Sequence, residues 1–161
     1  MTYKEKIHED LNSLLLQIGD WRSKGNKVVF TNGVFDLVHV GHVSYLEEAR
    51  SLGTKLIVGV NSDDSVSRLK GPNRPINKEF SRLAVLAGLQ SVDAVVIFEQ
   101  DTPLQLIKAV QPDILVKGGD YQLHEIVGAD EVLAAGGAVR RLDFISGYSS
   151  TVMINKILRD G

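Results

Sequence analysis

Residues 28–42 read VVFTNGVFDLVHVGH, a short apolar run followed by a segment that carries two glycines and two histidines. The apolar run from Val28 to Thr31 is typical of a buried strand, and the pattern predicts a helix from about Gly41 to Leu52. Parallel α/β sheets are built from strands that lead into helices through such loops. This stretch therefore predicts the start of an α/β domain.

The same alternation of strands and helices continues to the end of the chain. The strands are apolar enough to be buried on both faces, which favours a Rossmann-like, doubly wound parallel sheet of about five strands with helices on both faces. We expect one domain over residues 1–161, with an N-terminal helix from about Lys4 to Lys24 within residues 1–26 and the core over 27–161. Further strands are predicted at 55–60, 94–98, 114–116 and 139–142, with helices at 63–69, 78–89, 103–110, 131–135 and 150–159.

Composition excludes several classes of function. The chain has 161 residues, a net charge of −2 and no cysteine. Disulfides, thiolate nucleophiles and cysteine metal sites are thereby excluded, and nothing in the charge indicates a nucleic-acid or membrane partner. No apolar run has the length of a signal peptide or a membrane span, so a cytoplasmic location is the default expectation.

The segment between the first strand and its helix has the chemistry of a phosphate site. Ligands of doubly wound sheets bind beyond the carboxyl ends of the strands. A helix start there offers free backbone N–H groups, and His39 and His42, three residues apart, can present two imidazole donors to one oxyanion. A pair of ordinary loop histidines and a metal pair are the alternatives. The same rule directs attention to the segments 61–75, 98–102, 117–121 and 143–151.

Three of those segments hold further candidates, each with a plainer alternative. Lys70 follows the second strand and can reach a phosphate as a mobile charge, although many loop lysines are only solvated. Ser149, Ser150 and Thr151 begin the last helix, where they can cap it and also help to bind an anion. The turn 117–120 can line a ligand pocket or be a simple tight turn.

These motifs together resemble a known family. Residues 32–42 resemble the HxGH signature of the cytidylyltransferase-like nucleotidyltransferase superfamily, and Ser149-Ser150-Thr151 ahead of Ile154 resembles its second signature, with Tyr148 where isoleucine is usual. Residues 61–71 and 116–121 resemble the adenylyltransferase part of bacterial ADP-heptose synthases. The resemblance implies transfer of AMP from ATP to a sugar 1-phosphate, with heptose 1-phosphate expected. Pyrophosphate would be released, and the ADP-heptose would serve lipopolysaccharide or surface-glycan synthesis.

The resemblance also implies roles for individual residues. Mg²⁺ is expected to be held mainly by the nucleotide phosphates, with no protein metal site. The expected catalytic residues are His39, His42 and Lys70; the nucleotide-binding residues are Asn32, Gly33, Val34, Phe35, Gly41, Lys117, Gly119, Asp120, Ser149, Ser150 and Thr151; and the substrate-binding residues are Asp36, Arg74 and Arg82.

Other functions remain open at this point. A cytidylyltransferase acting on glycerol 3-phosphate or a related polyol phosphate would share both signatures and use CTP. A nucleotide-binding module without turnover is an alternative of another class, whereas a dehydrogenase is disfavoured because the first loop lacks a G-x-G-x-x-G run. A homodimer or higher homo-oligomer is expected. Because only about 26 residues precede the first strand, a separate heptose kinase is expected upstream in the pathway.

Overall fold

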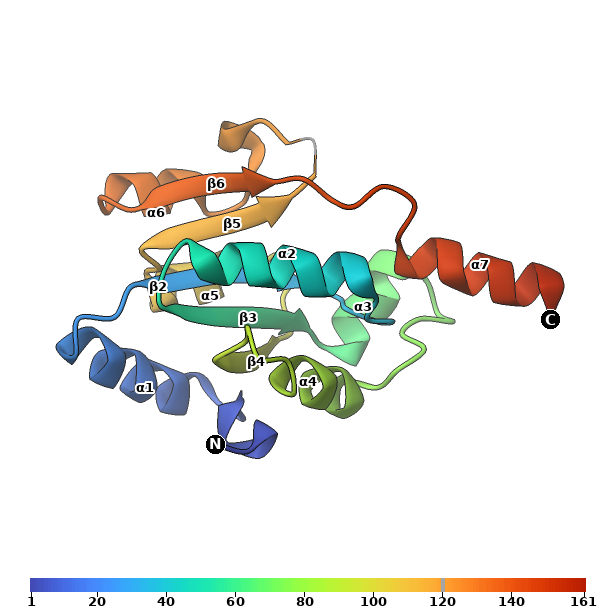
Figure 1. Cartoon of the computed structure of the whole chain (residues 1–161), viewed down its shortest axis with the longest axis horizontal. Coiled ribbons are helices and arrows are strands. Elements are labelled where there is room, and N and C mark those ends of the chain that lie inside the picture. The colour runs from blue at the N-terminus through green and yellow to red at the C-terminus, as the bar shows by residue number, and fades with distance from the viewer. Residues whose placement is uncertain (120) are drawn as a thin grey trace.

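Six parallel strands form one sheet in the computed structural model, which describes residues 1–119 and 121–161 (Figure 1). The strand order is β1-β4-β3-β2-β5-β6, so the chain moves outward from β2 first to one side and then to the other. Strand order therefore reverses between β2 and β5, which is where ligands of such sheets bind. The strands are β1 (Ile7–His8), β2 (Val28–Gly33), β3 (Lys55–Asn61), β4 (Ala94–Phe98), β5 (Ile114–Gly118) and β6 (Ala138–Leu142).

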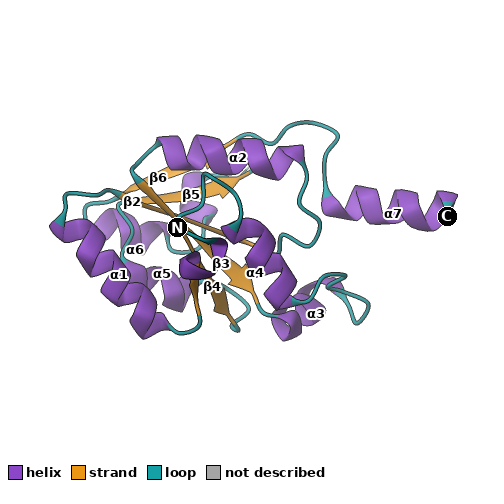
Figure 2. Ribbon diagram, turned by 60° about the horizontal axis from the view of Figure 1, so that its bottom comes forward, coloured by secondary structure: helices purple, strands orange, loops and turns teal. Residues whose placement is uncertain are grey.

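Helices cover both faces of this sheet, as the sequence predicts (Figure 2). The helices α1, α5 and α6 pack on one face, and α2 and α4 pack on the other. The α-helices are α1 (Leu11–Ser23), α2 (Val40–Ser51), α3 (Asp63–Lys70), α4 (Glu79–Ala87), α5 (Leu104–Val110), α6 (Ala129–Ala134) and α7 (Ser150–Asp160); short 3₁₀ helices are η1 (Tyr3–Lys6) and η2 (Leu123–Glu125).

The central strands are apolar on both sides because each side faces a helical layer. Val28 and Phe30 of β2 point into the core under α1 and α5, whereas Val29 points into the core under α2 and α4. All three side chains are fully buried. Complete burial of such a side chain contributes about 1.5–3 kcal/mol, so this strand fixes the middle of the sheet.

The N-terminal segment differs from the predicted helix over residues 4–24. The helix begins only at Leu11, because the Asp10 side chain caps it by accepting a hydrogen bond from Ser13 N at 2.7 Å. Ile7 and His8 instead form β1, which pairs with β4 and adds a sixth strand to the sheet. The apolar stripe of the helix is confirmed, since Leu14, Ile18 and Trp21 are buried.

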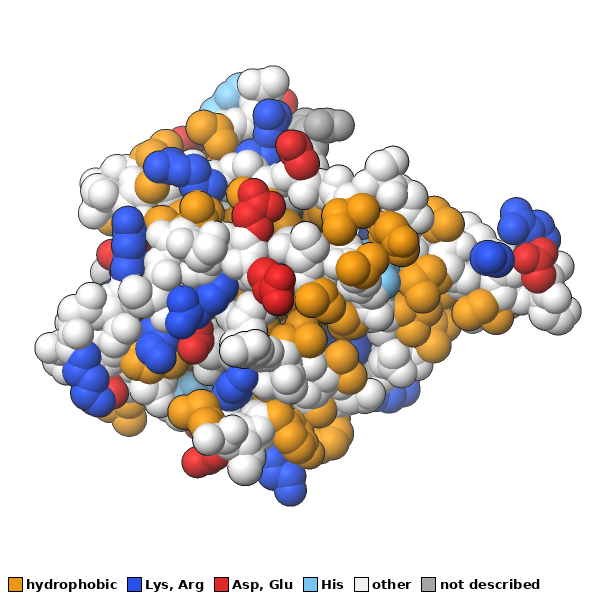
Figure 3. All heavy atoms as spheres, viewed as in Figure 1, with side chains coloured by type: hydrophobic (Ala, Val, Ile, Leu, Met, Phe, Trp, Pro, Cys, Tyr) orange, Lys and Arg blue, Asp and Glu red, His pale blue; other side chains and the backbone are white. Residues whose placement is uncertain are grey.

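The last helix stands apart from the rest of the molecule. In Figure 1, α7 projects away from the sheet, and none of its residues, all of which are described, is buried. Exposed hydrophobic side chains lie along it and on the preceding segment (Figure 3), among them Phe144, Tyr148, Val152, Ile157 and Leu158. Over residues 1–119 and 121–161, no helix has the length and apolar character that crossing a membrane requires.

Candidate active site

A cavity of about 650 Å³ lies at the carboxyl ends of the strands. It receives residues from the loop after β2, from the ends of β3 and β5, from α3 and the loop that follows it, from the loop after β4, and from the start of α7. These are the five segments that the sequence indicates. Its lining is Asn32, Gly33, Val34, Phe35, Asp36, His39, Gly41, His42, Asn61, Leu69, Lys70, Arg74, Asp101, Thr102, Pro103, Lys117, Tyr121, Val127, Phe144, Ile145, Tyr148, Ser149, Ser150 and Thr151.

The loop from β2 to α2, hereafter the first loop (residues 34–39), is tightly folded. Phe35 has a positive φ of 51°, a conformation that few non-glycine residues adopt. Its ring lies so close to Gly33 that a Cβ there would meet it at 2.8 Å. A Cβ on Gly41 would meet the His39 ring at 2.9 Å. Both glycines are therefore needed for side-chain packing within the site.

The two histidines form a stacked pair at the start of α2. Their ring centroids are 3.9 Å apart and the planes meet at 22°. His39 Nδ1 accepts a hydrogen bond from Gly41 N at 3.1 Å, and His42 Nδ1 accepts one from His39 N at 3.3 Å. Because a neutral imidazole that accepts at Nδ1 carries its proton on Nε2, both rings are donors at Nε2.

The surroundings keep both imidazoles neutral. Burial lowers the pKa of His39, and burial together with the neighbouring His39 lowers the pKa of His42 to about 4. His39 Nε2 is buried and has no hydrogen-bond partner within the described part of the chain. A buried donor without a partner is costly, so an oxygen of a bound ligand would satisfy it.

The start of α7 is fastened to the first loop. Ser149 caps the helix by accepting a hydrogen bond from Val152 N at 3.0 Å. The Ser150 hydroxyl donates to Leu37 O at 2.8 Å and accepts from Leu37 N at 3.3 Å. Two helix N-termini, those of α2 and α7, thus meet at one cavity, and both carry the partial positive charge that favours anions.

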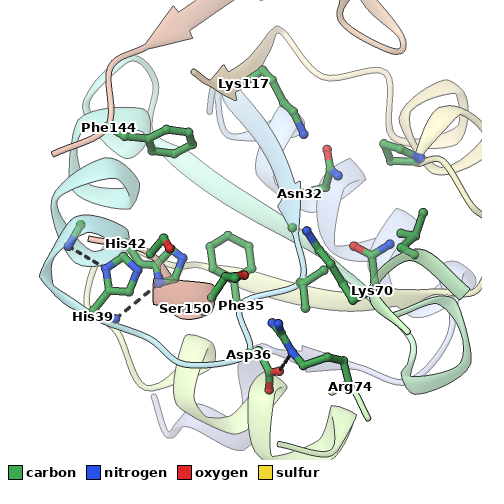
Figure 4. Close-up of a pocket in the computed structure, with 18 of the residues that line it drawn as sticks. Asn32, Phe35, Asp36, His39, His42, Lys70, Arg74, Lys117, Phe144 and Ser150 are labelled. Atoms are coloured by element: carbon green, nitrogen blue, oxygen red, sulfur yellow. Dashed lines mark hydrogen bonds and ion pairs between the residues drawn. The ribbon is translucent and has the colours of Figure 1, made fainter. Parts of the chain in front are cut away.

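Two lysines line the cavity from different elements. Figure 4 shows Lys70, at the end of α3, and Lys117, on β5, pointing into the same space with Asn32 between them. Burial and the charge of Lys70 lower the pKa of Lys117, whose Nζ lies 5.7 Å from the centroid of the Tyr121 ring. Neither lysine forms an ion pair with any described residue. Bound phosphate would relieve this repulsion.

Asp36 borders the cavity, but its carboxylate is already engaged. It accepts hydrogen bonds from Arg74 Nε at 2.8 Å, Ile76 N at 2.9 Å and Asn77 N at 2.8 Å. Burial raises the pKa of Asp36, but these hydrogen bonds and the charge of Arg74 outweigh burial and leave that pKa lowered. In this arrangement Asp36 holds the loop that follows α3, and its expected contact with substrate stays a prediction. Arg74 does line the cavity.

Arg82 is the third residue that the sequence predicts to bind substrate. Its side chain is completely buried, and it is not among the described residues that line the cavity. Its guanidinium donates to three backbone carbonyl oxygens and to Asp63. Arg82 thus joins parts of the site by hydrogen bonds, and its expected role in binding substrate stays a prediction.

The turn after β5 is placed only in part. Gly118 packs so closely against Phe144 that a Cβ there would overlap the ring. Gly119 has a φ of +102°, which favours glycine, but it is not one of the described lining residues. Asp120, predicted to bind nucleotide, lies outside the described residues. The sequence did not single out the lining aromatic residues Tyr121, Phe144 and Tyr148, which sit in loops without periodic signal.

A doubly wound parallel sheet with a cationic, two-histidine cavity at its switch point defines an α/β protein that binds a phosphorylated ligand. Comparison with known families matches residues 30–155 to the description "Cytidylyltransferase-like". The chain belongs to the cytidylyltransferase-like family and is a nucleotidyltransferase. The family expected from the two signatures is thereby confirmed.

Curated relatives share high sequence identity with the chain. It is 58% identical over 147 residues to "Bifunctional protein HldE" of Ectopseudomonas mendocina, which covers 91% of this chain and 31% of that protein. The protein of the same name from Pseudomonas aeruginosa strain PAO1 is 56% identical over 151 residues, covering 94% of this chain and 32% of that protein. The chain thus spans about a third of the length of these relatives.

Solved structures confirm the fold. A lipopolysaccharide core biosynthesis protein from Thermoplasma volcanium superimposes with a TM-score of 0.60 and 34% identity, over 78% of this chain and all of that one. A pantoate-beta-alanine ligase from Francisella tularensis superimposes with a TM-score of 0.59 over 95% of this chain and 78% of that chain. At 18% identity, the second likeness concerns the fold alone.

Proposed function

We propose that the protein transfers AMP from ATP to a sugar 1-phosphate, with heptose 1-phosphate as the first acceptor to test. The products are ADP-heptose and pyrophosphate, and the pathway is lipopolysaccharide or surface-glycan synthesis. The observation that carries the proposal is the convergence of two Nε2–H imidazoles, two lysines and two helix N-termini on one cavity. The relatives and the Thermoplasma protein named for lipopolysaccharide core biosynthesis support the choice of acceptor.

The proposed step is a displacement at the α-phosphorus of ATP. An oxygen of the sugar phosphate forms a bond to that phosphorus, and the bond between the α-phosphorus and the bridging oxygen of pyrophosphate breaks. The acceptor is already an anion, so the step needs no general base. The obstacle is the approach of one anion to another, and catalysis then consists of positioning and charge neutralisation.

The cavity residues divide this work by their chemistry. His39 and His42 donate from Nε2 to oxygens that gain charge as pyrophosphate leaves, and they do so as neutral groups. Lys70 and Lys117 supply mobile positive charge. Asn32, the first loop, Gly41 and the Ser149–Thr151 segment surround the nucleotide. Arg74 is retained as the candidate contact for the acceptor phosphate.

Mg²⁺ belongs to the proposal only as a companion of the nucleotide. No group of three or more His, Cys, Asp or Glu side chains in the described ranges is arranged to hold a metal ion. Of the carboxylates that line the cavity, Asp36 is fully hydrogen-bonded and Asp101 pairs with Arg68. The ion would be bound by phosphate oxygens and water, and it would offset phosphate charge there.

The test is pyrophosphate release with ATP or CTP across a panel of acceptors. The panel holds heptose 1-phosphate, other sugar 1-phosphates and glycerol 3-phosphate. Release with ATP and heptose 1-phosphate alone is expected. Release with CTP and glycerol 3-phosphate would favour the cytidylyltransferase alternative, which the family description supports. Stabilisation by nucleotide without release for any acceptor would favour a binding module.

Supply of the acceptor and the state of the protein complete the proposal. A kinase can form a sugar 1-phosphate, and we propose that a heptose kinase supplies the acceptor in the cytoplasm, where ATP is also available. A homodimer or higher homo-oligomer is proposed as the working state. Light scattering coupled to size-exclusion chromatography tests it, and a single species with the 17.6 kDa mass of one chain would contradict it.

A further inference from the structure

One buried arginine joins several walls of the cavity without lining it. Arg82 Nε donates to Asn77 O at 2.9 Å, and one terminal nitrogen donates to Val34 O at 2.9 Å and Asn61 O at 2.8 Å. The other terminal nitrogen donates to Asp63 Oδ1 at 2.9 Å. The side chain has 0% relative exposure, so these four acceptors are its entire environment of polar partners among the described residues.

The acceptors belong to different parts of the site. Val34 lies in the first loop, Asn61 ends β3, and Asn77 lies in the loop after α3. Asp63 is the first residue of α3, and Lys70 is the last residue of the same helix. Glu79 Oε2 also accepts a hydrogen bond from Asp63 N, at 2.7 Å. The beginning of α3 is thus held against α4, which carries Arg82.

The far end of α3 is held by a second set of contacts. Ser67 Oγ donates to Arg74 O at 2.6 Å, and Arg74 Nε in turn donates to Asp36 in the first loop. Lys70 lies between Ser67 and Arg74 in the chain. Its backbone is therefore fixed from both sides while its side chain stays free to meet a ligand (Figure 4).

We propose that Arg82 is a positioning residue that sets the place of Lys70 relative to the first loop and does not touch the substrate. This inference rests on the proposed function, because Lys70 is the group through which Arg82 would affect turnover. Only arginine meets the geometry, since its planar guanidinium directs five donors at fixed angles, whereas a lysine ammonium at the end of a flexible chain serves fewer acceptors.

The central experiment is a double-mutant cycle between Arg82 and Lys70, read as kcat and KM for pyrophosphate release. Arg82→Met is expected to lower kcat about 10-fold, no more than the loss of the Lys70 charge itself, with a smaller change in KM for ATP, since misplacement of a reacting group by about 1 Å can cost up to about 10²-fold. In a Lys70→Met background the same change is expected to cost less than about 3-fold, because the group it positions is already gone. Arg82→Lys is expected to restore part of the kcat.

Arg50→Met is the matched control. Arg50 donates to Asp93 Oδ2 at 2.7 Å and to Gly53 O at 3.3 Å, so it also joins a carboxylate to backbone, but at the opposite end of the sheet. Arg50→Met is expected to lower Tm and to leave kcat within about 2-fold of the wild type, because Arg50 is distant from the cavity and distant sites act independently. All variants are assayed well below their own Tm.

Three results would overturn the inference. They are an Arg82→Met protein with reduced Tm and wild-type kcat, equal losses with and without Lys70, and an Arg50→Met protein with the same kcat loss. Should Arg82→Met fail to fold, Asp63→Asn carries the test, because it replaces only the carboxylate that accepts the hydrogen bond from Arg82. Its kcat is expected to fall about 3- to 10-fold, again without additivity with Lys70→Met.

A readout without turnover separates this inference from the proposed function. Trypsin cleavage after Lys70 reports how firmly the end of α3 is held, and Arg82→Met is expected to accelerate it at least about 10-fold relative to Arg50→Met. If the wild type releases no pyrophosphate with any acceptor, the proposed function fails, while faster cleavage would still support the role of Arg82 in holding α3. Equal cleavage rates in the two variants would overturn that role.

Discussion

Ion pairs of arginine or lysine with aspartate occur at both ends of the parallel strands, and they serve different purposes there. The two ends are called the amino edge and the carboxyl edge of the sheet. At the amino edge, where the strands begin, Arg50 and Lys55 both lie within ion-pair distance of Asp93, at 2.7 and 3.7 Å. Asp93 also accepts a hydrogen bond from Leu56 N at 2.8 Å. Arg50 and Lys55 thus find their counter-charge within the chain itself.

At the carboxyl edge, arginines and lysines are treated differently. Arg74 and Arg82 are paired with Asp36 and Asp63 at 2.8 and 2.9 Å. Lys70 and Lys117 line the cavity and form no ion pair with the residues that the structure describes.

This difference separates the groups that build the site from those that serve the ligand. Guanidinium groups hold carboxylates and carbonyl oxygens in fixed directions, whereas ammonium groups on flexible stems can follow a moving charge. An edge that receives an anion therefore needs cations without an ion pair among the described residues, beside the cations that are paired. His39 also belongs to the groups that serve the ligand, because its Nε2 has no hydrogen-bond partner in the described ranges.

Loss of a histidine at the carboxyl edge should lower kcat more than any other proposed substitution. His42→Ala removes an Nε2–H donor from the cavity, and kcat for pyrophosphate release is expected to fall about 10²- to 10³-fold. The fold should persist, as circular dichroism can check. His124→Ala is the control, because His124 is exposed and belongs to η2. Turnover of His42→Ala close to the wild type would contradict the role given to the pair.

Removal of a free lysine should have the next largest effect. Lys70→Met keeps the length of the side chain but deletes its charge, and kcat should fall about 10- to 100-fold, as expected for a lost charge-assisted hydrogen bond. Lys156→Met, on the exposed face of α7, should leave kcat unchanged. The comparison of edges would fail if both substitutions had equal effects.

The free energy of unfolding should depend on pH through His42, which lies at the carboxyl edge. The pKa of His42 is lowered from 6.5 to about 4 in the folded protein, so between these pH values the unfolded chain binds more protons. Stability contributed by the neutral ring is present above pH 6.5 and is lost as the pH falls toward 4. Urea unfolding at pH 7 and pH 4.5 should show about 1–3 kcal/mol more loss for the wild type than for His42→Gln. Equal losses would place the folded pKa near 6.5.

The smallest effect is expected at the join between α7 and the first loop. Ser150→Ala removes two hydrogen bonds to Leu37, and turnover should fall about 3- to 10-fold, in line with about 1 kcal/mol for a net hydrogen bond. Thr54→Ala is a matched control, because its hydroxyl accepts from Lys27 N and donates to Lys27 O at the amino edge. A fall of 10²-fold for Ser150→Ala would mean that the hydroxyl itself contacts the ligand.

The fold of the core could be predicted from the sequence because burial on both faces leaves a direct trace in residue type. Apolar runs such as Val28–Thr31 and 94–98 coincide with β2 and β4. The edge strand β1 could not be found in the same way. Its two residues, Ile7 and His8, are strand only through pairing with β4, a contact about 90 positions distant along the chain.

The location of the site was predictable to the level of segments, since strand ends are visible in the sequence and the switch-point rule does the rest. The individual roles of Asp36 and Arg82 were not. A carboxylate that binds a ligand and one that holds a loop look the same in the sequence, and only the hydrogen bonds that Asp36 accepts from Ile76 N and Asn77 N show that it holds a loop.

The hydroxyl of Ser150 has a consequence for the order in which the molecule assembles. It joins two residues that are 113 positions apart, and the helix it begins adds nothing to either hydrophobic core. Closing so long a loop has an entropic cost that rises only slowly with its length. The contact between Ser150 and Leu37, however, can form only after the sheet exists. During synthesis the sheet can therefore form first, and the cavity receives its last wall when the C-terminal segment arrives. Ligand binding becomes a late event of folding, and the chain gains it in a single local step.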